Sequence, residues 1–240
     1  AFALELSRQF VYGKIYNSRT MMRRILRKEG TGKEKDRCRE LTDEIKGILN
    51  QVLTCDNLSA LRGYEGMAAK KYFQVFKYDL IQHGYTFIKR QRRPPKDPVN
   101  ALLSLGYSLL TNSMISICEI VGLDPYAGFF HAEKYNRPAL ALDLMEEFRV
   151  PIVDSVVLTC FNKTIIERKD FYQGENGGFY LKSHAYRRFL EQYTHRISTK
   201  ISLPSLNHKV RYQKAFELQA RAIRKAIENQ EVDYTPFLYH

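Results

Sequence analysis

Apolar residues recur at intervals of three and four over most of the chain, the pattern of helices that bury one face. Over residues 2–28 this pattern continues without Pro and with a single Gly. A second run covers 36–53, and a third begins at the N-cap candidates 56–59 and continues to about Ile81. The pattern predicts three long helices, with a turn at 30–35 between the first two.

Proline and glycine mark the boundaries of the later elements. The prolines within 88–98 predict a loop, and a long apolar helix follows at 98–121 with Gly122 in the position that ends helices. The other predicted elements are a turn at 124–128, a helix from Pro138 that is broken at Pro151, an apolar segment at 152–161, a hairpin at 171–181, and basic helices at 183–197 and 208–229. We therefore expect an all-α, multi-helix fold with one small β-hairpin, and a single domain over 1–240.

The cysteine spacing and the hydropathy exclude two classes of protein. The four cysteines are far apart and none falls in a CxxC pair, so a zinc site built on thiolates is not expected. We expect reduced structural cysteines and a location in the cytoplasm. No apolar run approaches the roughly 20 residues that span a membrane, and no membrane association is expected.

The net charge of +12 favours a polyanionic partner, with nucleic acid first and anionic membrane second. The basic residues are spread over many segments, which is unlike a basic amphipathic membrane helix. The 16 tyrosines can stack on bases or donate to phosphate. Charge alone also fits a basic protein with no specific ligand.

RGYEG, residues 62–66, is the first candidate for chemistry. Two glycines three apart in a helix share one face and cost roughly 1 kcal/mol each relative to alanine. The simplest reason to retain them is a close backbone approach by another helix or by a ligand. Glu65 stands between them; the alternative interpretation is an exposed Glu on a tightly packed helix.

Two further motifs supply a histidine and a pair of acids. His131 follows two aromatic residues in a loop, where a structural histidine is the alternative. Asp143 and Glu146 are three apart and share a helix face, although acid clusters on helices are also common. Two carboxylates and an imidazole suit Mg²⁺ or Mn²⁺ better than a thiophilic metal. Such an ion acts on phosphodiesters without a protein nucleophile.

The joint set of motifs resembles the CRISPR-associated integrases of spacer acquisition (Cas one). The resemblance runs through KIYNSRTMMRR (14–24), LRGYEGMAAKKYF (61–73), RRPPKDPVNALLSLGYSLL (92–110), GLDPYAGFFH (122–131) and RPALALDLMEEFR (137–149). It implies that Glu65, His131 and Glu146 are the catalytic metal ligands for Mg²⁺ or Mn²⁺. It also implies that Asp143 is a nearby second acid and that Asn100 and Tyr107 line the same pocket.

Six basic residues are expected to contact DNA. Lys134 and Arg149 stand three residues after a ligand, where the family often carries cations near phosphate, and a proline-stiffened loop groups three more. The expected set is Arg62, Arg92, Arg93, Lys96, Lys134 and Arg149. For the loop, the alternative is a solvated segment without a partner.

The resemblance implies a metal-dependent endonuclease and integrase that inserts short DNA spacers into a CRISPR array by transesterification. The partners would be DNA (prespacer fragments, the CRISPR repeat and branched DNA), a second copy of the chain and the small protein Cas two. The family's N-terminal β-sandwich has no counterpart in these residues. Two alternatives stay open: a casposase-type transposon integrase, and a non-catalytic basic module that binds DNA or supports assembly.

Overall fold

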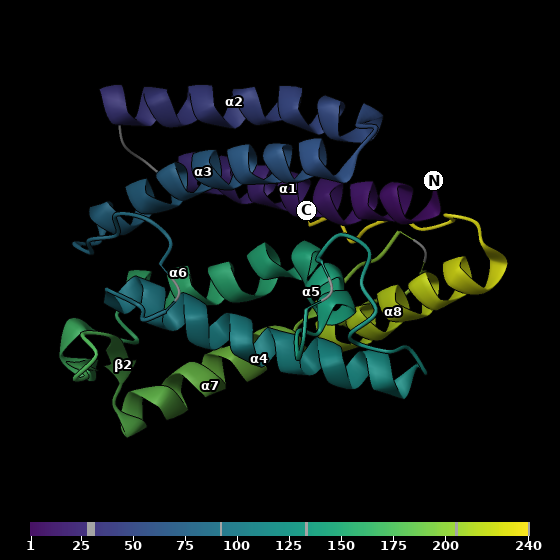
Figure 1. Cartoon of the computed structure of the whole chain (residues 1–240). Helices are drawn as coiled ribbons and strands as arrows, with labels where there is room; N and C mark the ends of the chain where they lie inside the picture. Colours follow the sequence, from purple (N-terminus) through teal and green to yellow (C-terminus); the bar gives the residue numbers. More distant parts are fainter. Residues whose placement is uncertain (28–31, 92, 133, 205, 240) are drawn as a thin grey trace.

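Long helices make up most of the protein in the computed structural model, which describes residues 1–27, 32–91, 93–132, 134–204 and 206–239. They form two groups, an N-terminal group of three helices and a larger group built by the rest of the chain (Figure 1). The all-α prediction is confirmed.

The first group consists of α1 (Phe2–Leu26), α2 (Lys33–Thr54) and α3 (Leu58–Gln82), which pack on one another pairwise. Asn57 caps α3, because its side-chain oxygen accepts a hydrogen bond of 2.8 Å from the Ala60 N–H. The three predicted helices are confirmed. The predicted turn at 30–35 is too long, since α2 already begins at Lys33; residues 30 and 31 lie outside the described part of the chain.

α4 (Pro98–Ile120) is the central helix of the second group (Figure 1). Asp97 caps it through a 2.7 Å hydrogen bond from the Asn100 N–H, and Gly122 follows it with a positive φ of 77°. By length and composition α4 could cross a membrane, so the expectation that no segment reaches that limit was wrong. Its leucines at 102, 103 and 110 are fully buried in the core, as in the core helix of a globular protein.

The helix predicted from Pro138 does not break at Pro151. After α5 (Ala139–Met145) the chain tightens into the 3₁₀ turn η1 (Glu146–Phe148) and then widens into the π-helical segment η2 (Arg149–Asp154), which leads into α6 (Ser155–Asn162). A π turn shifts the hydrogen-bond register, so Pro151 fits although it has no N–H. Single π turns are frequent at functional sites.

The predicted hairpin is confirmed. Strands β1 (Phe171–Gln173) and β2 (Phe179–Leu181) pair antiparallel, and α7 (Ser183–Ser198) follows. A second short pair, β3 (Lys200–Ile201) with β4 (Val210–Arg211), was not predicted, because two-residue strands leave no recognisable alternation. Helix α8 (Tyr212–Asn229) follows β4 directly.

The last residues of the chain run back along α1 (Figure 1). Asn17 Nδ2 donates to Phe237 O at 2.9 Å, and Asn17 Oδ1 accepts from the Tyr239 N–H at 2.7 Å. Phe237 also stacks on Phe148, with ring centroids 4.9 Å apart. The tail thereby joins α1 to η1.

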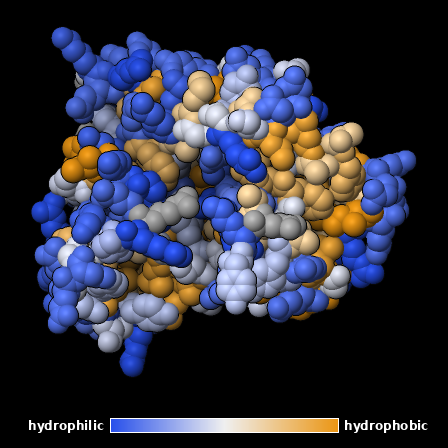
Figure 2. Space-filling view, viewed as in Figure 1, coloured by the Kyte–Doolittle hydropathy of each residue, from blue (hydrophilic) through white to orange (hydrophobic). Residues whose placement is uncertain are grey.

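Figure 2 shows mostly hydrophilic side chains on one face of the molecule, with an apolar region toward the end where α1 begins. At that end Phe2 and Leu4 of α1 are partly buried, and Leu53 of α2 is 46% exposed.

Candidate metal centre

Carboxylates from two separate helices meet at one cation. Glu65 comes from α3 and Glu146 from η1, and the ammonium group of Lys14, from α1, lies between them. Lys14 Nζ forms a short contact with Glu65 Oε1 and lies 2.7 Å from Glu146 Oε2. Sequence analysis missed Lys14. Its signal was a charged residue among the buried positions Phe10, Met21 and Ile25 of the same helix.

The third predicted ligand is held beside this pair. His131 Nδ1 lies 2.6 Å from Asp143 Oδ1, and its other ring nitrogen, Nε2, lies 3.6 Å from Glu146 Oε1. Because Asp143 contacts Nδ1, Nε2 is the ring nitrogen that faces Glu146. This carboxylate–histidine pair is a common second sphere of metal sites.

Asp143 also fixes the loop that carries His131. Its Oδ2 accepts hydrogen bonds from the N–H groups of Phe129 and Phe130 at 2.7 and 3.0 Å, and its Oδ1 accepts from the His131 N–H at 2.9 Å. The side chain is fully buried. Both the backbone and the ring of His131 therefore depend on one carboxylate.

Glu146 is ionised although it is buried. Burial alone raises the pKa of a carboxyl group, but the charges of Arg149 and Lys14 outweigh it and lower the pKa of Glu146 to about 2. Arg149 Nη2 lies 3.0 Å from Glu146 Oε1. A permanently charged carboxylate next to an imidazole suits a divalent cation.

Arg149 is linked through Tyr107 to another buried carboxylate, that of Asp154. Its guanidinium lies 4.9 Å from the centroid of the Tyr107 ring, and the Tyr107 hydroxyl donates to Asp154 at 2.6 Å. Tyr72 donates to the same carboxylate at 2.7 Å. Burial raises the pKa of Asp154, opposed by these two hydrogen bonds. Tyr107 is thus connected to the site by its contact with Arg149.

Asn100 takes part in a hydrogen-bond network with the loop before α4. Its Oδ1 accepts from Arg90 at 2.9 Å and from the Gln91 N–H at 2.8 Å, and its Nδ2 donates to Lys89 O at 2.9 Å. The Arg90 guanidinium lies 5.4 Å from the Tyr107 ring centroid. Asn100 is therefore connected to Tyr107 through Arg90, and its place in the pocket stays a prediction.

Among the described residues, no other helix packs closely against the two glycines of RGYEG. A Cβ placed on Gly63 or Gly66 would meet no described atom within 4 Å. The expected close approach by a helix was therefore wrong, and the face of α3 on either side of Glu65 is open. Approach by a ligand stays a prediction.

The expected DNA-contacting residues fall in two groups. Arg93, Lys96 and Lys134 are exposed. Arg62 donates to Phe130 O at 2.9 Å, which ties α3 to the loop of His131. Arg149 is mostly buried against Glu146 and differs from a free surface cation. Arg92 lies outside the described residues.

A buried hydrogen-bond cluster around Glu147, which was not predicted from the sequence, holds η1 in place. The carboxylate of Glu147 accepts hydrogen bonds from the Tyr234 hydroxyl and the Phe237 N–H, and Asn17 Nδ2 donates to Glu147 O at 2.7 Å. Burial raises the pKa of Glu147 to about 7, against the effect of its hydrogen bonds. The C-terminal tail thereby fixes the residue adjacent to Glu146.

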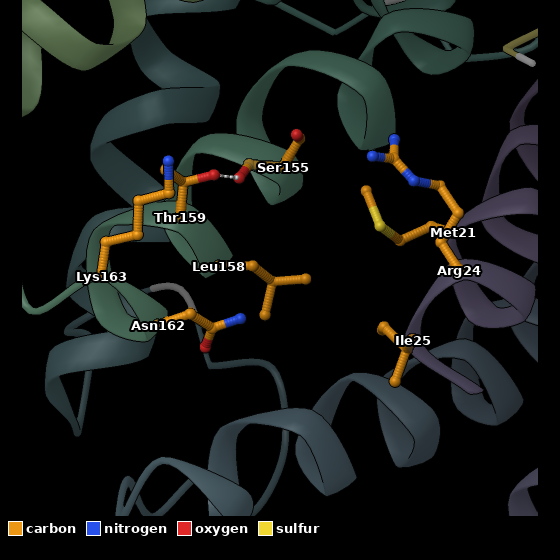
Figure 3. A pocket seen from close by; sticks show the side chains of 8 residues that line it. All are labelled: Met21, Arg24, Ile25, Ser155, Leu158, Thr159, Asn162 and Lys163. Carbon is orange, nitrogen blue, oxygen red and sulfur yellow. Dashed lines mark hydrogen bonds between the residues drawn. The ribbon is translucent and has the colours of Figure 1, made fainter. Parts of the chain in front are cut away.

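A hollow of about 350 Å³ lies between α1 and α6 (Figure 3). Met21 and Ile25 share a helix face with Lys14, and Met21 is about 10 Å further along the helix axis. The side chains around the hollow include two cations and no carboxylate: Met21, Arg24, Ile25, Ser155, Leu158, Thr159, Asn162 and Lys163. The lining of the hollow therefore carries a positive charge.

The carboxylate oxygens of Glu65 and Glu146 and the imidazole nitrogen of His131 are atom types that bind divalent cations. Glu146 Oε2 is buried, and its contact at 2.7 Å is the ion pair with the Lys14 ammonium. A positive charge already lies between the two carboxylates, which marks a cation position. Within the described residues, no three His, Cys, Asp or Glu side chains yet form a complete ligand cluster. The ligand set of Glu65, His131 and Glu146 stays a prediction.

A helical fold in which two carboxylates meet at one cation, with an imidazole beside them, is an arrangement found among proteins of the metal-assisted class. Within that class, residues 1–195 match the family model "CRISPR associated protein Cas1". The chain is 39% identical over 240 residues to the CRISPR-associated endonuclease Cas1 of Leptospira interrogans, covering 99% of this chain and 94% of that protein. The chain therefore belongs to the Cas1 family.

Solved structures agree on the fold. A chain of a Cas6-RT-Cas1–Cas2 complex superposes with a TM-score of 0.85 at 26% identity, over 100% of this chain and 25% of that chain. A casposase bound to its integration product gives a TM-score of 0.82 at 24% identity, over 97% of this chain and 63% of that one, a likeness of fold alone. Several other curated relatives are longer, and the chain spans about two thirds of their length.

Proposed function

We propose that this protein is a metal-dependent DNA endonuclease and integrase that inserts short DNA fragments into a CRISPR array by transesterification. Its relatives are named CRISPR-associated endonuclease Cas1. The observation that carries the proposal is the convergence of Glu65 and Glu146 on one cation, with His131 Nε2 beside them.

In this proposal Glu65, His131 and Glu146 hold one Mg²⁺ or Mn²⁺ ion. When bound, the ion polarises a phosphodiester and stabilises the charge on its oxygens. Asp143 keeps the His131 lone pair directed at the site, and Arg149 holds Glu146 in place. A DNA 3′-hydroxyl is the nucleophile, so no protein nucleophile is required.

We further propose that residues 1–240 act as one helical catalytic domain on prespacer, repeat and branched DNA. Exposed cations at Arg93, Lys96 and Lys134 and the hollow beside α1 would contact the phosphate backbone. The Cas6-RT-Cas1–Cas2 complex supports Cas two as a partner. A second copy of the chain completes the proposed assembly, which would act in the prokaryotic cytoplasm.

The test is cleavage of a branched DNA with Mg²⁺ or Mn²⁺. We expect Glu65→Ala and His131→Ala each to lose at least about a hundredfold in rate, as metal sites do when a ligand or its support is removed. Glu44→Ala is the matched control, because Glu44 also pairs with a lysine, Lys71, but away from the site.

Unchanged cleavage in both site variants would contradict the proposal. The alternative, a non-catalytic DNA-binding module, is motivated by the dispersed positive charge and predicts salt-sensitive DNA binding that does not depend on metal. Calorimetric titration with Mn²⁺ separates the two, since the enzyme requires a saturable site that Glu146→Ala removes.

A further inference from the structure

Lys14 lies at a position that a cofactor ion would need. It belongs to α1 between the buried residues Val11 and Ile15, and its side chain is only 17% exposed. A lysine this far buried is retained when paired charges compensate its desolvation. Here the compensation comes from Glu65 and Glu146, the same two carboxylates proposed to hold the metal.

The charge balance of the site depends on this ammonium. Glu65 is 23% exposed and Glu146 only 2%. Two carboxylates that share one cation repel each other more strongly where burial limits the access of water. Arg149 and His131 contact Glu146 Oε1, whereas Lys14 contacts Oε2 and also reaches Glu65. Among the described residues, Lys14 is the cation that joins the two acids.

We propose that Lys14 is an internal cation that occupies the metal position in the metal-free protein, and that a divalent ion must displace it. The proposal rests on the proposed function, because it assumes that Glu65 and Glu146 are metal ligands. Lys14 then determines how tightly the divalent ion binds. In the metal-free protein its charge offsets the repulsion between Glu65 and Glu146, so the site can stay closed.

A divalent ion and the ammonium group would compete for the same place between the two carboxylates. Mg²⁺ requires oxygen ligands at about 2.0–2.1 Å, whereas the ammonium group is 2.7 Å from Glu146 Oε2. An ion held by both Glu65 and Glu146 would therefore need the volume that the ammonium fills. The displaced group remains tethered to α1 by its four-carbon stem, next to any DNA phosphate that enters with the ion.

Calorimetric titration of Mn²⁺ into Lys14→Met tests the displacement. Methionine keeps the apolar stem and removes the charge. We expect the Kd for Mn²⁺ to fall about tenfold, because a repulsive unit charge is removed from a partly buried site. Lys71→Met is the matched control: it removes a lysine paired with Glu44, outside the metal centre, and its Kd should equal that of the wild type.

A second measurement uses the unaltered chain and does not depend on whether the variant folds. Lys14 amine labelling by acetic anhydride, followed by mass spectrometry, should increase severalfold when Mg²⁺ is added, while labelling of Lys71 stays constant. Equal or weaker Mn²⁺ binding by folded Lys14→Met, or unchanged Lys14 labelling in saturating Mg²⁺, would overturn the inference.

These outcomes separate the inference from the proposed function. Saturable Mn²⁺ binding that Glu146→Ala abolishes and Lys14→Met leaves unchanged overturns the role of Lys14 alone. The absence of a saturable site in wild type and Lys14→Met alike overturns the metal centre and this inference with it.

Discussion

Several side chains of the candidate site each contact more than one group. Asp143 bonds three successive backbone N–H groups and the ring of His131, so one carboxylate fixes both the loop and the direction of the imidazole. Glu146 likewise contacts Arg149, Lys14 and His131. Because these side chains share partners, they are held in position before any ligand binds.

The open face of α3 provides a prediction at the residue scale. Gly66→Ala should raise the free energy of unfolding by up to about 1 kcal/mol, because alanine favours the helix and the added methyl meets no atom within 4 Å. If DNA approaches this face closely, the same change lowers the rate of branched-DNA cleavage. Urea denaturation and a cleavage assay measure the two effects.

Gly47→Ala on α2 is the matched control, since its added methyl is equally free. It should stabilise the protein by a similar amount without altering cleavage. Full activity in Gly66→Ala would show that the glycine is not retained for contact with DNA.

At this scale the candidate residues could be named from the sequence, but their contacts could not. The spacing of Asp143 and Glu146 indicated a shared helix face, and both acids lie beside His131. Asp143 also binds the backbone of the His131 loop, whereas Glu146, in the 3₁₀ turn, contacts Lys14 and Arg149. Lys14 was missed because its partners lie on other helices. Periodicity within α1 carries no information on them.

At the scale of elements, irregular helix geometry places the site. The succession of α, 3₁₀ and π turns from α5 to α6 places Glu146 against Lys14 of α1 and Arg149 against Glu146 and Tyr107 of α4. Pro151 was expected to end a helix because its ring removes one backbone donor. Only the packed structure shows that the chain widens there and continues.

The hairpin provides a prediction with a defined pH dependence. Asp170 is 2% exposed and lies 2.9 Å from His184 Nε2 and 2.7 Å from Arg188 Nη2 of α7. Burial raises its pKa, but the hydrogen bonds from Glu167, His184 and Arg188 prevail and lower the pKa below the usual value of 3.8. Its stabilisation is therefore present above that value and is lost as the pH falls through the lower, folded pKa.

Asp170→Asn should lower the free energy of unfolding at pH 7 by about 1–3 kcal/mol, the range for hydrogen bonds to a charged group. The difference from wild type should shrink below pH 3. Urea denaturation at both pH values measures it, with the exposed Asp43→Asn on α2 as control. A loss that is equal at both pH values would mean that the charge of Asp170 is not its stabilising feature.

At the scale of the whole molecule, the candidate metal centre and the hollow beside α6 share one face of α1, which joins the two groups of helices. Consecutive phosphates of one DNA strand advance about 3.4 Å along the axis of a duplex, so the roughly 10 Å from Lys14 to Met21 corresponds to about three nucleotides, or fewer in an extended single strand. The hollow would therefore receive the strand just beyond the reacting phosphodiester.

Replacing Arg24 and Lys163 together by Ala should weaken DNA binding and make the slope of log K against log salt less steep by about two, one for each phosphate that is no longer neutralised. Fluorescence anisotropy at several salt concentrations measures both. Because neither side chain touches Glu65, His131 or Glu146 in the described structure, Mn²⁺ affinity should not change. Arg37→Ala, which removes an exposed cation of α2 paired with Glu40, is the control for loss of charge alone. If the double variant and the control have the same salt slope, the strand does not pass through this hollow, and the net charge of +12 attracts DNA without directing it there.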